Sequence, residues 1–284
     1  MKTRDVGRWP LWFLTLSALA CAVGSGCSSR TDGKASPKQE PAYVKPSHKI
    51  GSGQTYQVRH VSAAKIELDG RAEEPTWAQA VVEKQFVFPW KQSPAPATEF
   101  RALWDDDNFY FSYRVQDADI VVLENLRDAR DAVLEDRVEF YLCRDEQMKD
   151  CYCVEMDSRG RVFDYHASYY RQFDPKWDFA GLETKGSPLP DGYEVEGRIP
   201  LKDIMALGFP PVQPGTKVRF GIYRAEFSHD RSGRKIEQHE TAHNLGRKME
   251  GPPPIEEWIS WVDPKISEPD FHVPASLGWL EFVK

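Results

Sequence analysis

From Val58 onward the chain is dominated by short runs of β-branched and aromatic residues that alternate with polar ones. In the run RVEFYL, Val138, Phe140 and Leu142 fall on one face of an extended strand, and the residues between them fall on the other. Turn-forming pairs separate the runs, namely Asp69-Gly70, Asp191-Gly192 and Pro214-Gly215. This pattern predicts an all-β fold, an antiparallel β-sandwich.

Two short segments read as helical among these strands, EEPTWAQA at residues 73–80 and LKDIMALG at residues 201–208. No internal repeat and no further shift in composition interrupts the pattern. We therefore expect a single folded domain over residues 58–284, with one or two short helices.

The charge of the chain is acidic, with 37 Lys and Arg residues against 44 Asp and Glu residues. Nucleic-acid binding depends on basic patches that neutralise phosphates, and the sequence has none that we can identify. We therefore expect no nucleic-acid partner.

The N-terminal segment has the pattern of an export signal over residues 1–26. Three basic residues, Lys2, Arg4 and Arg8, precede the apolar run PLWFLTLSALACAVG, and small residues lead to Cys27. This is typical of a bacterial lipoprotein signal, in which Cys27 becomes lipidated after cleavage. Plain secretion, or lipidation at Cys21, is the alternative.

Residues 27–57 are rich in Ser, Pro, Gly and Lys and poor in apolar residues, as in a flexible linker. Such a linker would hold the domain at a distance from a lipid anchor. We expect an exported protein, lipid-anchored to the bacterial outer membrane or cell surface, which contacts the membrane through its lipid alone.

Three cysteines remain in the predicted domain, Cys143, Cys151 and Cys153. Cys143 ends one predicted strand and Cys151 begins the next, so a cross-strand disulfide from Cys143 is expected in an oxidising compartment. The third thiol is left over. A three-cysteine metal site is the alternative, although no fourth soft ligand lies nearby.

Six motifs occur in a fixed order: IELDGRAEEPTWAQA (66–80), TEFRALWDDDNFYFSYRVQD (98–117), LEDRVEFYL (134–142), YEVEGRIPL (193–201), ISWVDP (259–264) and FHVPASLGWLEF (271–282). Together they make the chain resemble the family 9 carbohydrate-binding modules found on xylanases and a looser group of family 9-like exported proteins. The resemblance implies a jelly-roll β-sandwich that binds a polysaccharide or oligosaccharide without catalysis and supports carbohydrate catabolism. It requires no cofactor, although calcium often has a structural role in the family.

The resemblance also implies a binding slot in which two parallel tryptophans hold a sugar. Trp261 matches one of them, whereas Val133 stands at the position of the other. Glu139 matches a carboxylate that binds sugar hydroxyls. Glu155 replaces a ligand-binding arginine, and Tyr223 replaces a glutamine. Trp77 and Trp104 match framework positions and are expected in the core.

These residue types suit saccharides, because a pyranose ring has an apolar C–H face and a rim of hydroxyl groups. We therefore expect Trp261 to be the stacking surface, with Glu139, Glu155 and Tyr223 forming hydrogen bonds to hydroxyls. The alternatives are ordinary core packing for the indole and solvated or ion-paired strand positions for the glutamates.

Two groups of aspartates, Asp105-Asp106-Asp107 and Asp117-Ala118-Asp119, follow predicted strands. Carboxylate oxygens are the ligands that Ca²⁺ prefers, so either group is a candidate calcium site. A polar turn is the alternative.

The segment HETAH at residues 239–243 fits the zinc-peptidase pattern, with His239 and His243 as ligands and Glu240 as base. The residues before it are nearly all polar and include Gly233, and a third ligand is not evident. A zinc metallopeptidase is therefore the alternative function. A glycoside hydrolase would need a pair of carboxylates that no motif singles out, and Met156, a conceivable haem ligand, is expected in the core.

Overall fold

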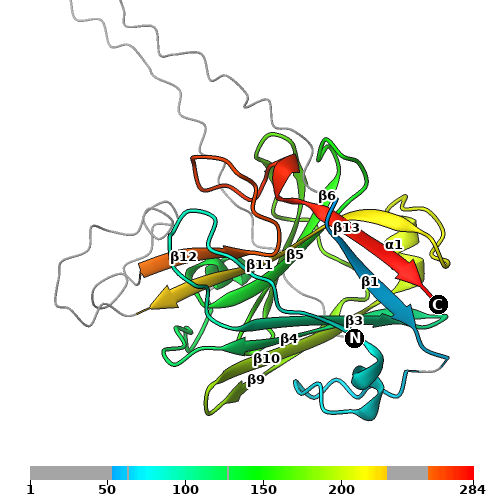
Figure 1. The fold of residues 1–284 in the computed structure, drawn as a ribbon, viewed down its shortest axis with the longest axis horizontal. Coiled ribbons are helices and arrows are strands. Elements are labelled where there is room, and N and C mark those ends of the chain that lie inside the picture. The colour runs from blue at the N-terminus through cyan, green and yellow to red at the C-terminus, as the bar shows by residue number, and fades with distance from the viewer. Residues whose placement is uncertain (1–52, 63, 127, 229–254) are drawn as a thin grey trace, which may run out of the picture. The chain divides into compact units, whose positions relative to one another are not determined.

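The computed structural model describes residues 53–62, 64–126, 128–228 and 255–284, in which the alternating runs form strands (Figure 1). The strands are β1 (Thr55–His60), β2 (Val81–Glu83), β3 (Thr98–Trp104), β4 (Asn108–Gln116), β5 (Arg137–Cys143), β6 (Cys151–Asp157), β7 (Val162–Ser168), β8 (Gln172–Asp174), β9 (Glu183–Leu189), β10 (Gly192–Pro200), β11 (Lys217–Ser228), β12 (Ile255–Ser260) and β13 (Gly278–Val283).

Hydrogen bonds join these strands into one sheet in the order β8-β7-β6-β5-β11-β13-β1-β3-β4-β10-β9, with β12 beside β11 and β2 beside β3. The first strand, β1, runs parallel to both β13 and β3. All other pairs among the described strands are antiparallel. The predicted all-β fold is confirmed, but the sheet is mixed because β1 is inserted between two strands that run in its own direction.

The sheet curls into a sandwich, with β3, β4 and β10 lying opposite β5, β6 and β11 (Figure 1). Aromatic rings join the two layers: Phe111 on β4 lies 5.0 Å from Phe140 on β5, and Phe100 on β3 lies 5.9 Å from Phe220 on β11, between ring centroids. The predicted core face of β5 is confirmed, because Val138, Phe140 and Leu142 all belong to this interlayer core.

A second, smaller apolar cluster lies on the opposite face of β5 and β6. It consists of Tyr141, Cys143, Met148, Cys151, Cys153, Tyr165, Ala167, Tyr223, Phe271 and Leu277. Residues 271–277 belong to the segment between β12 and β13, so this segment covers the outer face of the β5–β6 layer. Both faces of β5 are therefore buried, which explains why all seven of its residues are inaccessible to solvent.

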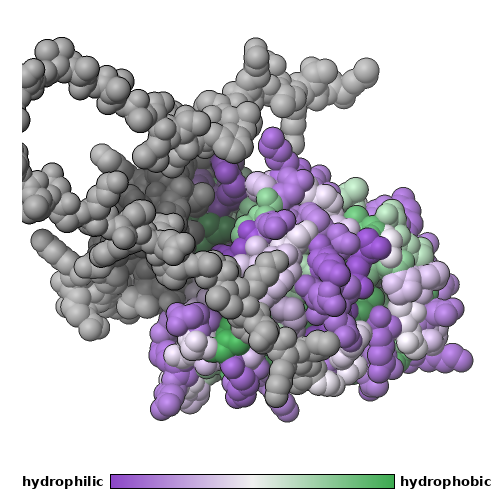
Figure 2. All heavy atoms as spheres, turned by 90° about the horizontal axis from the view of Figure 1, so that it is seen from above, coloured by the Kyte–Doolittle hydropathy of each residue, from purple (hydrophilic) through white to green (hydrophobic). Residues whose placement is uncertain are grey.

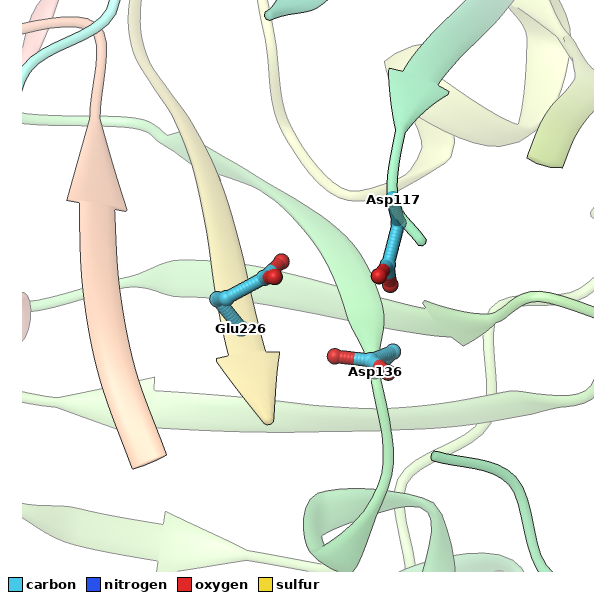
Figure 3. Close-up of side chains that lie close together, drawn as sticks. All are labelled: Asp117, Asp136 and Glu226. Carbon is cyan, nitrogen blue, oxygen red and sulfur yellow. The ribbon is translucent and has the colours of Figure 1, made fainter. Parts of the chain in front are cut away.

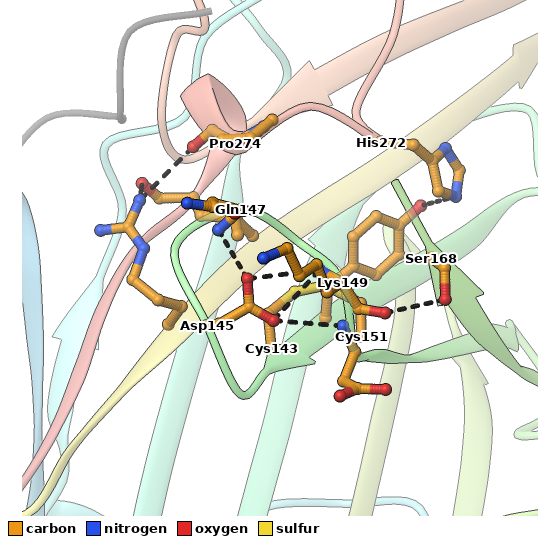
Figure 4. Close-up of a disulfide and its surroundings, with 12 residues drawn as sticks. Cys143, Asp145, Gln147, Lys149, Cys151, Ser168, His272 and Pro274 are labelled. Carbon is orange, nitrogen blue, oxygen red and sulfur yellow. Dashed lines mark hydrogen bonds between the residues drawn. A yellow bond between two sulfur atoms is a disulfide. The ribbon is translucent and has the colours of Figure 1, made fainter. Parts of the chain in front are cut away.

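The predicted disulfide from Cys143 is confirmed, and its partner is Cys151 (Figure 4). The two cysteines face each other at the ends of β5 and β6. The connecting loop is held by Asp145, whose carboxylate accepts hydrogen bonds from the backbone N–H groups of Gln147 and Lys149 at 2.8 and 3.1 Å. Cys153 is the leftover thiol, and it is buried.

Helical structure in the described residues is limited to the α-helix α1 (Leu201–Ala206) and three 3-10 helices, η1 (Pro75–Gln79), η2 (Ala129–Leu134) and η3 (Pro274–Ser276). The helical prediction for residues 201–208 is confirmed by α1, and residues 73–80 form the single 3-10 turn η1. Trp77 and Trp104 are buried, as expected of framework positions.

The surface visible in Figure 2 is mostly hydrophilic where it is described, with hydrophobic residues in a few smaller groups. None of the helices in the described residues has the length and apolar character needed to cross a membrane.

Candidate functional site

A cavity of about 440 Å³ opens on the outer face of the β5–β6–β7 layer. Its wall comes from five strands, from η2, from Trp90 and from the segment that precedes β13. The lining residues are Trp90, Arg130, Val133, Arg137, Glu139, Tyr141, Glu155, Phe163, Tyr165, Arg171, Phe173, Pro175, Trp258, Pro269, Asp270, Phe271 and His272. Its volume lies in the range of about 300–1,000 Å³ that is common for small-molecule sites.

Two glutamates and an arginine form the polar floor of this cavity. Glu139 on β5 and Glu155 on β6 are direct cross-strand partners, so both carboxylates point to the same face. Arg137 lies between them, with its Nε 2.8 Å from Glu139 Oε1 and 2.9 Å from Glu155 Oε2. All three side chains are buried. One guanidinium group thus forms ion pairs with two carboxylates.

Two phenol groups complete the hydrogen bonding of the floor. Tyr141 donates to Glu139 Oε2 at 3.1 Å, and Tyr165 donates to Glu155 Oε1 at 3.0 Å. His272 joins them from above, because its Nε2 lies 2.9 Å from the Tyr165 hydroxyl and 3.3 Å from that of Tyr141. The floor is thus a continuous network that holds each polar group in a fixed orientation.

Burial, and then the neighbouring charge of Glu155, raise the pKa of Glu139 to about 8, against the opposing effect of Arg137. Burial also raises the pKa of Tyr141 and that of Tyr165 well above their ordinary values. Burial therefore favours the neutral form of the two phenols and of Glu139 in the cavity floor.

Asp270 closes one side of the cavity. Burial alone would raise the pKa of Asp270, but hydrogen bonds from His272 and Tyr170 outweigh burial and hold the pKa at about 2. The Tyr170 hydroxyl donates to Asp270 Oδ2 at 2.7 Å, and Arg171 lies 3.0 Å from Oδ1. This carboxylate is therefore ionised at neutral pH and ties the β7–β8 turn to the segment before β13.

Aromatic side chains form the remaining walls. Phe271 is central: its ring lies 5.3 Å from that of Trp90 and 5.6 Å from that of Trp258, with the Trp258 contact nearly perpendicular. The Arg137 guanidinium lies 5.3 Å from the Trp258 ring centroid. Phe173 stands at the rim with 41% of its surface exposed. The cavity therefore joins apolar ring faces to a hydrogen-bonding floor.

The structure brings together three of the residues that the sequence resemblance singled out. Val133, Glu139 and Glu155 all line the cavity. Tyr223 does not line it. Its ring stacks on Phe271 at 4.3 Å, and its hydroxyl lies 2.7 Å from Ser276 Oγ. Tyr223 is fully buried and supports the aromatic wall from behind, so it is a supporting residue and not the direct contact that the resemblance implied.

The expectation that Trp261 forms the stacking surface needs correction. Its indole is only 2% exposed and packs in the interlayer core, where Nε1 donates to Glu83 Oε2 at 3.0 Å. A ring enclosed on both faces cannot stack on a sugar. Trp258, which we did not single out, lines the cavity instead. The two positions differ by three residues, and an odd spacing in extended chain places side chains on opposite faces.

Three buried or partly buried carboxylates meet at another place in the fold: Asp117 after β4, Asp136 before β5 and Glu226 on β11 (Figure 3). One oxygen of each lies within 4.8 Å of the others. Burial, and then the charges of Asp117 and Glu226, raise the pKa of Asp136 to about 9. Oxygen ligands of this kind suit hard divalent cations such as Ca²⁺.

The expected calcium groups are thus only partly represented in this cluster. Asp117 belongs to the cluster, but Asp119 does not. The backbone N–H of Asp119 instead donates a hydrogen bond to Asp117 Oδ1 at 2.8 Å. Asp105 accepts hydrogen bonds from the N–H groups of Asp107 and Asn108 at 3.0 and 2.8 Å, which is the polar-turn arrangement. The HETAH segment, with His239, Glu240 and His243, lies outside the described residues.

Comparison with known proteins agrees with this fold. The family described as carbohydrate family 9 binding domain-like matches residues 68–244. A family 9 carbohydrate-binding module from Caldicellulosiruptor kristjanssonii, solved with cellotriose and with glucose, is 18% identical to this chain with a TM-score of 0.50 in both cases. It covers 81% of this chain, and the alignments cover 94% and 95% of the two solved chains.

A proposed carbohydrate-binding protein from Bacteroides uniformis ATCC 8492 has a TM-score of 0.56 and 19% identity, and the alignment covers 81% of this chain and all of that one. No curated protein sequence matches. The family match extends over more than half of the chain, and the fold of the solved structures is the same. The chain belongs to the carbohydrate family 9 binding domain-like family.

Proposed function

We propose that this protein is a non-catalytic saccharide-binding protein and that the saccharide binds in the cavity above Glu139 and Glu155. The observation that carries the proposal is the combination of aromatic walls and a buried carboxylate and phenol floor in one cavity. Val133, Glu139 and Glu155, three positions where the family resemblance places ligand contacts, line this same cavity.

The chemistry of the cavity suits a sugar ring. The apolar C–H face of a pyranose would pack against Trp258 or Trp90, and its hydroxyl groups would reach the floor. Glu139 Oε1 and Glu155 Oε2 face each other across the shared Arg137 Nε, at 2.8 and 2.9 Å. These two oxygens are the acceptors that we assign to sugar hydroxyls.

The ligand that we propose is a short oligosaccharide or one end of a polysaccharide chain. A cavity of about 440 Å³ has the volume of a site for a small ligand. The solved family 9 module from Caldicellulosiruptor binds glucose and cellotriose, which makes these two sugars the first ligands to test.

The proposed setting is the bacterial cell surface. An export signal over residues 1–26, lipidation at Cys27 and a flexible linker over residues 27–57 would tether the binding domain to a membrane by its lipid alone. A domain held there would retain saccharides close to the cell and so support their breakdown by other proteins.

Isothermal titration calorimetry of the purified full-length chain with glucose, cellotriose and a wider glycan panel tests this proposal. We expect saturable binding, and we expect Trp258→Ala to weaken it at least tenfold. Trp279→Phe is the matched control, because Trp279 lies on β13 under Arg219 and does not line the cavity. Equal binding by the wild type and Trp258→Ala would show that the saccharide does not bind in this cavity. Hydrolysis of any bound glycan would overturn the non-catalytic assignment.

A further inference from the structure

The part of the cavity that a ligand can touch is largely apolar. The side chains of the polar floor, from Arg137 to Tyr165, are all buried. Apolar lining residues keep more of their surface exposed, and they include Trp90, Val133, Phe163, Phe173, Pro175 and Trp258. They come from different elements, among them η2, β7, β8 and β12. Apolar surface therefore surrounds a ligand on several sides, whereas polar contacts are concentrated at the floor.

The charged groups of the cavity wall are already paired with opposite charges. Arg171 lies 3.0 Å from Asp270, and Arg130 lies 3.1 Å from Asp128. In the floor, Arg137 pairs with both glutamates. A ligand that carries a full charge would have to compete with one of these pairs for its partner. The cavity therefore favours a ligand without net charge.

The aromatic residues form two walls. The tryptophan wall consists of Trp90 and Trp258, which Phe271 joins. The β7–β8 wall consists of Phe163 and Phe173, whose rings lie 5.1 and 5.5 Å from the ring of Tyr165. A volume of about 440 Å³ is in the range of sites that enclose drug-sized ligands, which are larger than one sugar ring. One wall can therefore pack against a sugar while the other accepts a second group.

We propose that the saccharide bound by this protein carries an aromatic substituent, and that the substituent packs against the β7–β8 wall of Phe163 and Phe173. This inference rests on the proposed saccharide function and names the class of ligand. An aromatic ring gains from apolar burial and from stacked or edge-to-face contacts with the two phenylalanines. Sugar hydroxyl groups held against the same rings would lose hydrogen bonds to water without a replacement.

Two kinds of neutral saccharide share this chemistry, namely aryl glycosides and aromatic esters of sugars. Isothermal titration calorimetry of the full-length chain distinguishes them with two pairs of probes. Phenyl β-D-glucopyranoside is compared with methyl β-D-glucopyranoside, and 6-O-benzoyl-D-glucose is compared with 6-O-acetyl-D-glucose. We expect the aromatic member of at least one pair to bind at least tenfold more tightly. Equal affinity within both pairs, or no binding of any of the four probes, would overturn the inference.

Cyclohexyl β-D-glucopyranoside tests whether the wall selects an aromatic ring or only apolar bulk. We expect it to bind more weakly than the phenyl glucoside, because a saturated ring lacks the π-face and polarised edge that aromatic pairs use. An affinity equal to that of the phenyl glucoside would contradict an aromatic substituent.

Phe173→Ala tests the place of the substituent. Phe173 stands at the rim with 41% of its surface exposed, so its replacement should leave the fold intact, which Tm measurement checks. We expect the preference for the phenyl over the methyl glucoside to fall at least threefold. Met205→Ala is the matched control, because Met205 is 39% exposed, lies on α1 and does not line the cavity. An unchanged preference in Phe173→Ala, or an equal fall in Met205→Ala, would overturn the assignment.

Phe173→Leu keeps an apolar side chain at the rim while it removes the aromatic ring. It is the variant to use if Phe173→Ala lowers Tm. We expect Phe173→Leu to reduce the preference for the phenyl over the cyclohexyl glucoside. An unchanged preference would show that the Phe173 ring does not contact the substituent.

Failure of this inference is distinguishable from failure of the saccharide function. If glucose or cellotriose binds and the aromatic probes bind no more tightly than their partners, the inference fails and the saccharide function stands. If phenol alone binds as tightly as the phenyl glucoside and no member of the glycan panel binds, both fail.

Discussion

Glu139 and Glu155 are cross-strand partners whose carboxylates share a single guanidinium, that of Arg137, in the buried floor of the cavity. Burial raises the pKa of Glu139, and the nearby charge of Glu155 raises it further. Because both glutamates pair with Arg137, either one can compensate its charge when the other is replaced.

The glutamate pair should respond non-additively to mutation. Glu139→Gln and Glu155→Gln should each lower the free energy of unfolding by less than about 1 kcal/mol, because the remaining glutamate still compensates Arg137. The double variant leaves a buried guanidinium without a charge partner in the floor and should lose about 3–5 kcal/mol. Urea unfolding of all three variants measures the coupling. Additive losses would contradict the shared-cation arrangement.

Stability should fall as the pH rises from weakly acidic to weakly alkaline values. The folded pKa of Glu139, about 8, exceeds its ordinary value of 4.5, so the folded state holds more protons between these values. Buried Glu135 and Glu196, with pKa values raised by burial to about 8 and about 7, act in the same direction.

Urea unfolding between pH 5 and pH 9 measures this slope. Glu139→Gln should reduce it, whereas Glu124→Gln, which alters a side chain that is 83% exposed, should leave it unchanged. A slope of the opposite sign over this range would contradict the assignment of raised pKa values.

Asp270 should act in the opposite direction at low pH. Its folded pKa of about 2 lies below the ordinary value of 3.8, so its contribution to stability is present above pH 4 and is lost as the pH falls toward 2. Asp270→Asn should therefore lower the free energy of unfolding at pH 6 and approach wild-type stability near pH 2. The same deficit at both pH values would indicate lost packing instead.

The two tryptophans at positions 258 and 261 should separate binding from stability. Trp261→Ala empties a buried core position and should cost about 3–5 kcal/mol in the free energy of unfolding. Trp258→Ala opens one wall of a cavity and should cost clearly less, while it removes most of the saccharide affinity. Urea unfolding and calorimetry on the same preparations make the comparison, and a reversed order of stabilities would show that the two roles are misassigned.

The Cys143–Cys151 disulfide should contribute modestly, because it closes a short loop between residues only eight positions apart. Chain-entropy arguments give about 2–3 kcal/mol for a loop of this size. A Cys143→Ser/Cys151→Ser variant should lose this amount while it retains saccharide affinity, since neither cysteine lines the cavity. A loss of affinity in the folded variant would mean that the disulfide positions the cavity wall.

Much of the fold could be predicted because its signals are local. Alternation along RVEFYL placed Val138 and Phe140 toward the core and Glu139 on the other face, as observed. The parallel insertion of β1 between β13 and β3 left no local signal, since a strand's pairing partners depend on distant segments. Alternation along a strand does not show whether another segment covers the outer face of the sheet. The complete burial of Glu139, on the outer face of β5, was therefore not predicted.

Site residues were predicted correctly only at positions that the family resemblance identified. Val133, Glu139 and Glu155 line one cavity, but the choice between Trp258 and Trp261 required knowing which face of β12 meets that cavity. Asp136 and Glu226 were missed because they come close only when β5 pairs with β11 in the folded sheet. A cluster assembled by strand pairing has no spacing that a linear motif can capture.

The position of β1 between the last strand and β3 also bears on the order in which this protein can assemble. The curled sheet has a seam there that closes only when β13, at residues 278–283, is available to pair. During synthesis, β1 can therefore pair with β13 only after nearly the whole polypeptide is made, and a chain truncated before β13 exposes unpaired edges that favour aggregation. Completion of the sheet is thus a late event set by topology.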